Sequence, residues 1–419
     1  MTDPKPFLRA LFDRAVAAAD PMQSLAAHLP PRSEGRLVVV GAGKASARMA
    51  EAVEDVYGPC EGLVITRYGH ARPCEGVEIV EAAHPVPDEA GARATARMLE
   101  LLRGLGEGDM VLALISGGAS ALLVQPAGDL TLAEKQAVNE RLLASGAPIG
   151  RMNVLRKHLS RVKGGQLAAA AWPARMLALM ISDVPGDDPA MIGSGPTVGE
   201  ASTPAEARAI AERYGVDLPD AAQAVLSNPT GVVAPDDRRL SRTENVIYAA
   251  PRQSLEAAAE LAQAQGTAVE ILGDAIEGEA REIAAQHAAL ARAAQGRLAP
   301  GGAPLLLLSG GELTVTRRGD GVGGPNAEYA LALAAALDGA PGIHAIACDT
   351  DGVDGAADVA GAVIGPDTLM RAAALGLDPA QALADNDAHR FFGALGDQVI
   401  TGPTLTNVND FRAILVAPI

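Results

Sequence analysis

Carboxylate side chains follow three of the apolar segments that the sequence predicts as β-strands. Ser-Asp-Val-Pro-Gly-Asp-Asp comes after 175–181, Asp-Thr-Asp-Gly follows 343–348, and a glutamate follows 305–308. Carboxylates at strand ends can hold Mg²⁺ when substrate phosphates supply further ligands. A single acid here would often be a turn former or a helix cap, but three acidic turns in one chain favour a metal site. The acids are Asp183, Asp187, Asp188, Glu312, Asp349 and Asp351.

A glycine turn that carries a lysine follows the apolar segment 36–40. Its sequence is Gly41-Ala-Gly-Lys44-Ala-Ser46, and an alanine-rich helical pattern comes next. Glycines allow a tight turn, and a helix N-terminus presents N–H groups to an anion. The turn lacks the Gly-x-x-x-x-Gly-Lys pattern, and a serine stands where a dinucleotide-binding turn has its third glycine. The next predicted strand ends in Thr66-Arg67 without a ribose-binding acid. An ordinary strand-to-helix turn is the alternative.

Three further segments combine glycines with hydroxyl or basic side chains. Segment 116–120 follows the apolar run 110–115, and segment 309–312 follows 305–308 with a similar Ser-Gly-Gly sequence. Segment 317–326 has two arginines, four glycines and a proline suited to the first position of a helix. All three are candidates for holding phosphate oxygens, and an exposed loop is the alternative for the last. The residues singled out are Ser116, Gly117, Gly118, Ser120, Ser309, Gly310, Gly311, Glu312, Arg318, Gly323, Gly324 and Asn326.

Four cations lie within eight residues, at Arg156, Lys157, Arg161 and Lys163. Local positive charge of this kind attracts small anions even in an acidic protein. A solvated helix face is the alternative, because runs of charge are commonly exposed. His158, inside the run, is the histidine with the most suggestive neighbours and is a candidate general base.

Short apolar runs alternate with helical patterns along the chain, which predicts an α/β fold. Runs that are apolar throughout, such as 38–40 and 305–308, indicate strands buried on both faces, as in parallel sheets. Predicted strands are 36–40, 62–66, 77–81, 110–115, 175–181, 245–249, 268–272, 304–308, 343–348 and 411–416. Predicted helices include 88–103, 132–145, 205–214, 254–265, 277–294 and 326–337.

Composition restricts the domain number and the function class. The length of 419 residues suggests two or three domains, and the polar, turn-rich stretch 227–243 predicts a division into 1–235 and 236–419. A net charge of −17 and 3% aromatic residues argue against nucleic-acid binding and against an anionic membrane surface. Three scattered cysteines fit a reducing compartment, and no signal peptide or membrane span is expected, so we predict a cytoplasmic protein.

Taken together, these motifs resemble the glycerate 2-kinase family, also called type II glycerate kinases or the MOFRL family. The resemblance covers nearly the whole chain and rests on many short blocks in one order. The blocks are Val40-Gly-Ala-Gly-Lys44-Ala, Thr66-Arg-Tyr-Gly-His70, Ala83-His-Pro-Val-Pro-Asp88, Ile115-Ser-Gly-Gly-Ala-Ser120, Arg156-Lys-His-Leu-Ser160, Lys163-Gly-Gly165, Ser182-Asp-Val-Pro-Gly-Asp-Asp188, Gly193-Ser-Gly-Pro-Thr197, Ser309-Gly-Gly-Glu312, Asp349-Thr-Asp-Gly-Val-Asp-Gly355, Thr401-Gly-Pro-Thr404 and Thr406-Asn-Val-Asn-Asp410.

The resemblance implies transfer of a phosphoryl group from ATP to the 2-hydroxyl of D-glycerate, with Mg²⁺, giving 2-phosphoglycerate and ADP. It implies two α/β domains, the N-terminal one Rossmann-like with a mostly parallel sheet, and an active-site cleft between them. A homodimer stays open as the oligomeric state.

The expected site divides into four groups of residues. The expected catalytic residues are Lys44, His158, Asp183 and Asp187. Lys44 is also expected to bind substrate, with Ser116, Gly117, Gly118, Ser120, Arg156 and Lys157. Segments 309–312 and 318–326 are expected to bind ATP, through Ser309, Gly310, Gly311, Glu312, Arg318, Gly323, Gly324 and Asn326. The expected metal ligands are Asp183, Asp188, Asp349 and Asp351.

One position departs from the family pattern. The family commonly has Gly-Gly-Arg-Asn-Gln-Glu in the late glycine loop, whereas this chain has Pro325 in place of the arginine. Arg317 or Arg318 is then the nearest source of positive charge. Two other functions stay open: an NAD(P)H-dependent hydroxypyruvate reductase, a label often given to members of this family, and a non-catalytic regulator that binds a sugar acid or a nucleotide.

Overall fold

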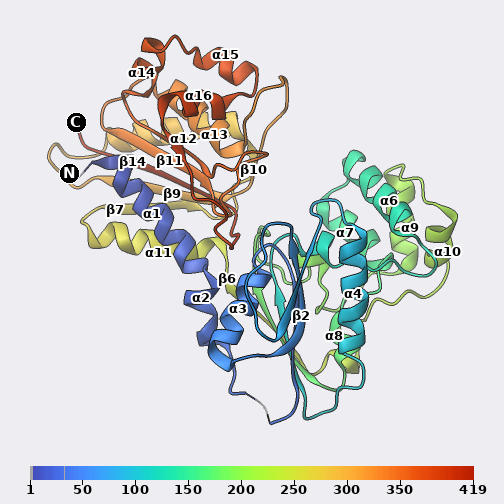
Figure 1. Ribbon diagram of the computed structural model, residues 1–419. Coiled ribbons are helices and arrows are strands. Elements are labelled where there is room, and N and C mark those ends of the chain that lie inside the picture. The colour runs from blue at the N-terminus through green and yellow to red at the C-terminus, as the bar shows by residue number, and fades with distance from the viewer. Residues whose placement is uncertain (1–2, 33) are drawn as a thin grey trace. The chain divides into compact units, whose positions relative to one another are not determined.

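The computed structural model describes residues 3–32 and 34–419 and divides into two compact units (Figure 1). We call residues 21–248 the N-terminal unit. The C-terminal unit combines residues 1–20 with residues 249–419. The predicted division at residue 235 stays a prediction, and the 227–243 stretch contacts the N-terminal unit, where Val233 N–H donates to Gly164 and Val233 O accepts from Glu200 N–H.

The N-terminal unit is built on a six-stranded sheet with the order β3-β2-β1-β4-β5-β6. The pairs β3–β2, β2–β1, β1–β4 and β4–β5 are parallel. This order is that of a doubly wound, Rossmann-type sheet, so the prediction for this unit is confirmed. The strands are β1 (Leu37–Ala42), β2 (Glu61–Arg67), β3 (Val77–Ala82), β4 (Met110–Ile115), β5 (Arg175–Ile181) and β6 (Thr243–Ala249).

Helices cover this sheet because their apolar stripes match its apolar faces. In α4, Ala94 and Met98 are buried, whereas Arg93, Arg97 and Glu100 are exposed on the other side of the helix. The helices are α2 (Pro21–Ser24), η1 (Leu25–His28), α3 (Ser46–Tyr57), α4 (Glu89–Leu101), α5 (Ala119–Leu122), α6 (Leu132–Ala144), α7 (Ile149–His158), α8 (Gln166–Ala171), η2 (Ile192–Ser194), α9 (Pro204–Arg213), α10 (Asp220–Leu226) and η3 (Arg238–Leu240).

The C-terminal unit has a second six-stranded sheet, with the order β13-β12-β11-β14-β9-β7. The β7–β9 pair is parallel, but the other four pairs are antiparallel. The prediction that 305–308 lies in a parallel sheet is therefore right for its pairing with β7 and wrong for its pairing with β14. Its strands are β7 (Ala268–Gly273), β9 (Leu305–Gly311), β11 (Ile343–Asp349), β12 (Gly361–Ile364), β13 (Gln398–Val399) and β14 (Asp410–Val416), and a two-stranded sheet pairs β8 (Gly278–Glu279) with β10 (Leu313–Thr314).

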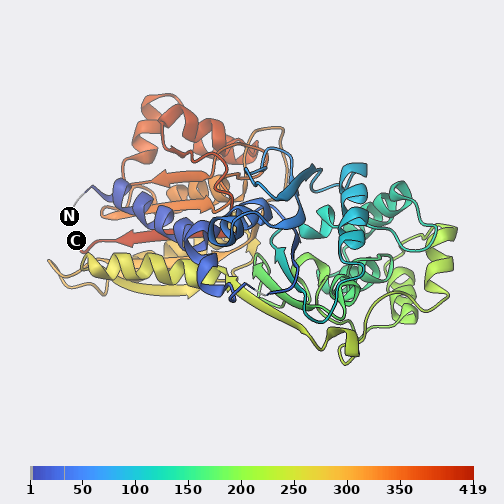
Figure 2. The same cartoon turned by 60° about the horizontal axis from the view of Figure 1, so that its bottom comes forward.

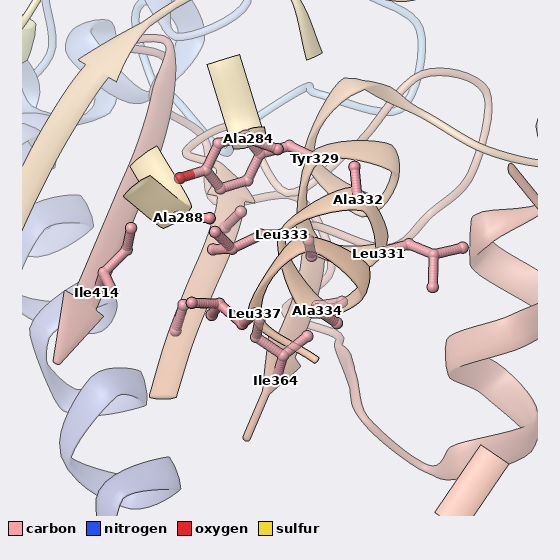
Figure 3. Close-up of a cluster of buried hydrophobic side chains, with 14 of the residues drawn as sticks. Ala284, Ala288, Tyr329, Leu331, Ala332, Leu333, Ala334, Leu337, Ile364 and Ile414 are labelled. Atoms are coloured by element: carbon pink, nitrogen blue, oxygen red, sulfur yellow. The ribbon is translucent and has the colours of Figure 1, made fainter. Parts of the chain in front are cut away.

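The strand sequences of this sheet are apolar because helices bury both of its faces. On one face, Tyr329, Leu333 and Leu337 of α13 pack toward Ile364 and Ile414 of the sheet (Figure 3). On the other face lie α1 and α11, and the blue helix α1 runs along the sheet in Figure 2. The helices are α1 (Pro4–Ala19), α11 (Pro251–Ala264), α12 (Ala280–Gln295), α13 (Pro325–Leu337), α14 (Thr368–Ala374), α15 (Pro379–Ala384) and α16 (Ala388–Leu395).

All ten predicted strands and all six predicted helices are present, with ends that differ by a few residues. The short strands β8, β10, β12 and β13 were missed, because two to four residues carry too little pattern to predict a strand. Within the described residues, no helix combines the length and the apolar character that crossing a membrane requires.

Candidate functional site

The lysine turn between β1 and α3 is locked against the end of β4. Lys44 N–H donates to Gly117 O (2.8 Å), and Ala45 N–H donates to Ser116 Oγ (3.0 Å). The Ser116 hydroxyl also lies 3.1 Å from that of Ser46. A glycine is required at position 43, where φ is +141° and a Cβ would overlap the Ser116 hydroxyl. The predicted substrate residues Ser116 and Gly117 therefore hold the turn that carries Lys44, and both are buried.

A cavity of about 590 Å³ opens beside this turn, and we call it the β4–α7 pocket. Three predicted substrate residues, Gly118, Ser120 and Arg156, line it together with His84 and an apolar wall. A Cβ on Gly118 would lie 3.0 Å from the His84 ring and 3.5 Å from Lys44 Cγ. The structure thus brings the two glycine turns and the start of the cationic segment to one pocket of the N-terminal unit, with the lysine side chain close to its glycine wall.

A chain of hydrogen bonds runs behind the pocket wall and connects Lys163 to Arg156. Lys163 Nζ donates to Ser120 O (2.7 Å) and to Ser120 Oγ (3.3 Å). Ser120 Oγ is 2.8 Å from Ser194 Oγ, which donates to Asn153 Oδ1 (3.2 Å). Arg156 Nη1 reaches the same Asn153 oxygen at 3.5 Å. The two wall residues, Ser120 and Arg156, are therefore held by one network.

Positive charge collects behind this wall. Burial lowers the pKa of Lys163 far below its ordinary value, and the nearby cations Lys135, Arg156 and Lys157 lower it further. Burial, with a smaller contribution from Arg156, lowers the pKa of Lys135 to about 7. Burial also lowers the pKa of Arg156. Perturbed cations beside a pocket are a common mark of a functional site.

Lys157 and His158 do not line this pocket, and their expected roles stay predictions. Lys157 Nζ forms a 2.7 Å ion pair with Glu200 Oε2, and the two side chains are 5% and 12% exposed. The ring of His158 is buried, and its nitrogens lie 2.6 Å from Thr230 Oγ1 and 3.2 Å from Ser202 Oγ. Consecutive residues of a helix point about 100° apart, so only one residue of this run faces the pocket. We carry neither residue into the proposed site.

The acidic turn after β5 has the donor chemistry of a magnesium site. Asp183 and Asp187 are half-buried, and Asp187 Oδ1 is a buried oxygen without a hydrogen-bond partner in the described structure. Asp188 is exposed and accepts from Ala190 N–H at 2.9 Å. The described residues contain no group of three or more His, Cys, Asp or Glu arranged to hold a metal alone. These oxygens fit a cation that takes one or two carboxylates and completes its shell with phosphates and water, as Mg²⁺ does.

The second Ser-Gly-Gly segment is part of a strand, so its expected likeness to the first segment was wrong. Ser309, Gly310 and Gly311 continue β9 to its end. The guanidinium of the fully buried Arg412 donates to Ser309 Oγ (3.3 Å) and Gly310 O (2.5 Å). Glu312, next along the chain, is exposed. The pattern of an apolar run before Ser-Gly-Gly does not distinguish a strand that ends from one that continues.

The late glycine loop leads into a helix whose first N–H groups already donate hydrogen bonds to a carboxylate. Asn326 and Ala327 N–H donate to Asp354 Oδ1 (2.9 Å) and Oδ2 (2.8 Å). The Asn326 amide donates to Asp410 Oδ1 at 2.6 Å. Pro325 begins α13 as predicted, but the expected phosphate contact of Asn326 competes with this internal pairing. Around it, Gly323 and Gly324 pack on neighbouring backbone, while the Arg318 side chain is exposed.

The remaining two acids lie where β11 ends. Asp349 is the last residue of β11, and its Oδ1 accepts from Asp351 N–H at 2.8 Å. Asp351 is buried, and its Oδ1 accepts from Val353 N–H at 2.9 Å. The two carboxylates therefore shape the turn, and their expected role as metal ligands stays a prediction.

Ser194, Asn153 and Lys135 were missed as site residues. Ser194 adopts a left-handed conformation (φ +63°), which is uncommon outside glycine and often marks a functional site. Its only sequence signal is the flanking glycines, and Asn153 and Lys135 have none, because each becomes relevant only through contacts with residues far along the chain.

Comparison with known proteins gives matches over both units. A family model described as a domain of unknown function, DUF4147, matches residues 7–227, and the model of the MOFRL family matches residues 305–410. The chain is 53% identical to a putative hydroxypyruvate reductase of Agrobacterium vitis, over 98% of this chain and 94% of that protein. It is 37% identical to the D-glycerate 2-kinase of Thermotoga maritima, over 95% and 94%.

The fold agrees with these matches. A crystal structure of glycerate kinase from Thermotoga maritima superposes with a TM-score of 0.91 at 37% identity and covers 99% of each chain.

Proposed function

The chain belongs to the family defined by the DUF4147 and MOFRL domains, and we propose that it is a glycerate 2-kinase. The reaction transfers the terminal phosphoryl group of ATP to the 2-hydroxyl of D-glycerate and yields 2-phosphoglycerate and ADP. The observation that carries this proposal is the likeness, in sequence and fold over nearly the whole length, to a protein named D-glycerate 2-kinase.

The β4–α7 pocket supplies what such a reaction needs on the substrate side. Phosphoryl transfer depends on positioning and on neutralising charge more than on covalent chemistry. Arg156 offers a half-buried guanidinium in the pocket wall, and Lys44 lies beside Gly118 at the same wall. We assign the carboxylate of glycerate, or the phosphoryl group in transfer, to these two cations. Since His158 is buried in hydrogen bonds, an aspartate is the better candidate to take the hydroxyl proton.

Mg²⁺ would neutralise charge on the phosphates of ATP. Asp183 and Asp188 of the turn after β5 are the proposed ligands in the N-terminal unit, with Asp187 beside them. Asp349 and Asp351 are the corresponding candidates of the C-terminal unit. Oxygen donors of this kind match the preference of Mg²⁺, which keeps part of its water and shares its shell with phosphates.

A hydroxypyruvate reductase is the second candidate function, because the Agrobacterium relative carries that name. Such an enzyme needs a nicotinamide dinucleotide, whose ribose is usually held by an acid at the end of the second strand. Here β2 ends at Thr66-Arg67, and the Thr66 hydroxyl donates to Gly43 O (3.1 Å) inside the turn. The contacts of this turn therefore favour the kinase.

One pair of assays separates the two functions. The purified chain is incubated with ATP, MgCl₂ and D-glycerate while ADP is measured, and separately with NADH or NADPH and hydroxypyruvate while absorbance at the nicotinamide band is followed. The kinase proposal expects ADP that depends on glycerate and no nicotinamide oxidation above the rate without enzyme. The reverse result would establish the reductase.

A further inference from the structure

Three cations, Arg156 in the wall of the β4–α7 pocket and Lys135 and Lys163 behind it, lack a carboxylate partner among the described residues. Lys163 is 1% exposed and Lys135 is 3% exposed, and Arg156 is half-buried. Within the described part of the chain, none of the three forms an ion pair, and the charged groups that act on Lys163 are all cations: Lys135 from α6, and Arg156 and Lys157 from α7. The carboxylate on the pocket wall, Glu140, is exposed at its edge.

Such an arrangement of buried cations costs free energy when no anion lies beside them. A buried ammonium among like charges loses its hydration without gaining a partner, and proteins normally avoid this. Lys157 shows the usual solution in the same segment, since Glu200 neutralises it at 2.7 Å. Lys163 instead donates its hydrogen bonds to the neutral oxygens of Ser120. The missing negative charge is best explained by a ligand.

We propose that Lys163 is a positioning residue that prepares the β4–α7 pocket for an anionic group of the ligand, either a carboxylate or a phosphate. Lys163 acts through Ser120, whose main-chain oxygen and hydroxyl it holds, and through the chain of Ser194 and Asn153 that ends at Arg156. Arg156 is the cation that touches the anion. This inference rests on the proposed function for the identity of the anion, which is then the carboxylate of glycerate or a phosphate of ATP.

The first test measures binding without turnover. Isothermal titration calorimetry gives the Kd of D-glycerate, inorganic phosphate and ADP, each without the co-substrate, for the wild-type chain and for Lys163→Met. Methionine is similar in length and suits an apolar site. Arg161→Met is the matched control, because it removes one charge of the same segment at an exposed position.

We expect Lys163→Met to weaken binding of at least one of the three ligands tenfold or more, and Arg161→Met to leave all three Kd values within twofold. Weaker glycerate binding alone identifies the carboxylate, whereas weaker ADP and phosphate binding identifies the nucleotide. Unchanged Kd values in Lys163→Met would overturn the proposal. Since no phosphoryl transfer is measured, the result stands apart from the success or failure of the kinase assignment.

Stability distinguishes this role from a structural one. If Lys163 served only to tie Ser120 into the fold, Lys163→Met would lower the melting temperature. If the charge of Lys163 serves to bind a ligand, Lys163→Met removes a buried charge that has no ion-pair partner. The melting temperature should then stay the same or rise while binding is lost. A lower melting temperature with intact binding would contradict the proposal.

A third readout uses the wild-type chain alone and serves if the variant does not fold. Titration in two buffers of different ionisation enthalpy reports protons taken up on binding. Burial lowers the pKa of Lys135 to about 7, and a bound anion should raise that pKa together with the lowered pKa of Lys163, so we expect proton uptake near neutral pH. Binding of glycerate and phosphate with no proton uptake would overturn the proposal.

Discussion

Gly43 gives the sharpest test of how the lysine turn is built. It has φ +141°, and a Cβ added there would overlap the Ser116 hydroxyl and lie 2.6 Å from Ser116 O. A positive φ costs an alanine about 1–2 kcal/mol. Forcing a methyl group into a packed site adds about 1–3 kcal/mol. We therefore expect Gly43→Ala to lower the free energy of unfolding of the N-terminal unit by about 3 kcal/mol.

Gly215→Ala is the matched control, because it separates backbone strain from overlap. Gly215 also has a positive φ (+63°), but nothing lies within 4 Å of its added Cβ. We expect this variant to lose about 1 kcal/mol, the cost of the backbone alone.

The fluorescence of Trp172 reports directly on the unfolding of the N-terminal unit. Trp172 is the one tryptophan of the sequence and lies in the N-terminal unit, next to Arg238. Denaturant unfolding of both variants, followed at this residue, gives the two free energies. If both variants lost the same free energy of unfolding, steric overlap with Ser116 would not limit the side chain at position 43. Gly43→Ala should also lower kcat/KM for glycerate by about 10²-fold, the usual effect of displacing a positioned group by about 1 Å.

Three charged side chains test other parts of the structure. Lys44→Ala should lower kcat/KM for D-glycerate by about 10²-fold with an unchanged unfolding midpoint, because one electrostatic group is lost; wild-type kinetics would remove Lys44 from the site. Lys157→Ala should lower the free energy of unfolding by about 3 kcal/mol, because it leaves the nearly buried Glu200 carboxylate without its ion-pair partner. The KM for glycerate should stay close to that of the wild type. A large change in KM with normal stability would instead make Lys157 a substrate residue. Burial, with a smaller contribution from Arg412, lowers the pKa of His287 to about 4 in the fold, against about 6.5 unfolded. The unfolded chain therefore binds more protons between these values, so stability should be complete above pH 6.5 and fall by about 3 kcal/mol on acidification to pH 4; His287→Gln should flatten this dependence, and an equal slope in the variant would contradict it.

Much of the fold could be predicted from sequence because buried strands and amphipathic helices leave strong local patterns. The Rossmann-type unit follows from apolar runs such as 110–115, which became β4 without change. The direction of the second sheet could not be predicted. Leu305–Leu308 is apolar because helices cover both faces, and that burial is the same for parallel and antiparallel neighbours.

The site was predictable in type more than in detail. The sequence predicts a lysine turn, a serine-glycine turn and a cationic segment, but it does not say which cation of 156–158 faces the pocket. Arg156 lines the pocket, whereas Lys157 pairs with Glu200 across 43 positions of sequence. Lys163 and Ser194 stand in segments that the sequence singled out, but neither was given a role in the site, because their contacts with Ser120 cannot be predicted from a local pattern.

The identity of the product is the sharpest measurement of the proposed reaction. The chain is incubated with ATP, MgCl₂ and D-glycerate, and ³¹P NMR then resolves the phosphate esters formed. A glycerate 2-kinase should form 2-phosphoglycerate together with an equal amount of ADP. Formation of 3-phosphoglycerate, or full recovery of ATP and glycerate by an otherwise folded protein, would contradict it.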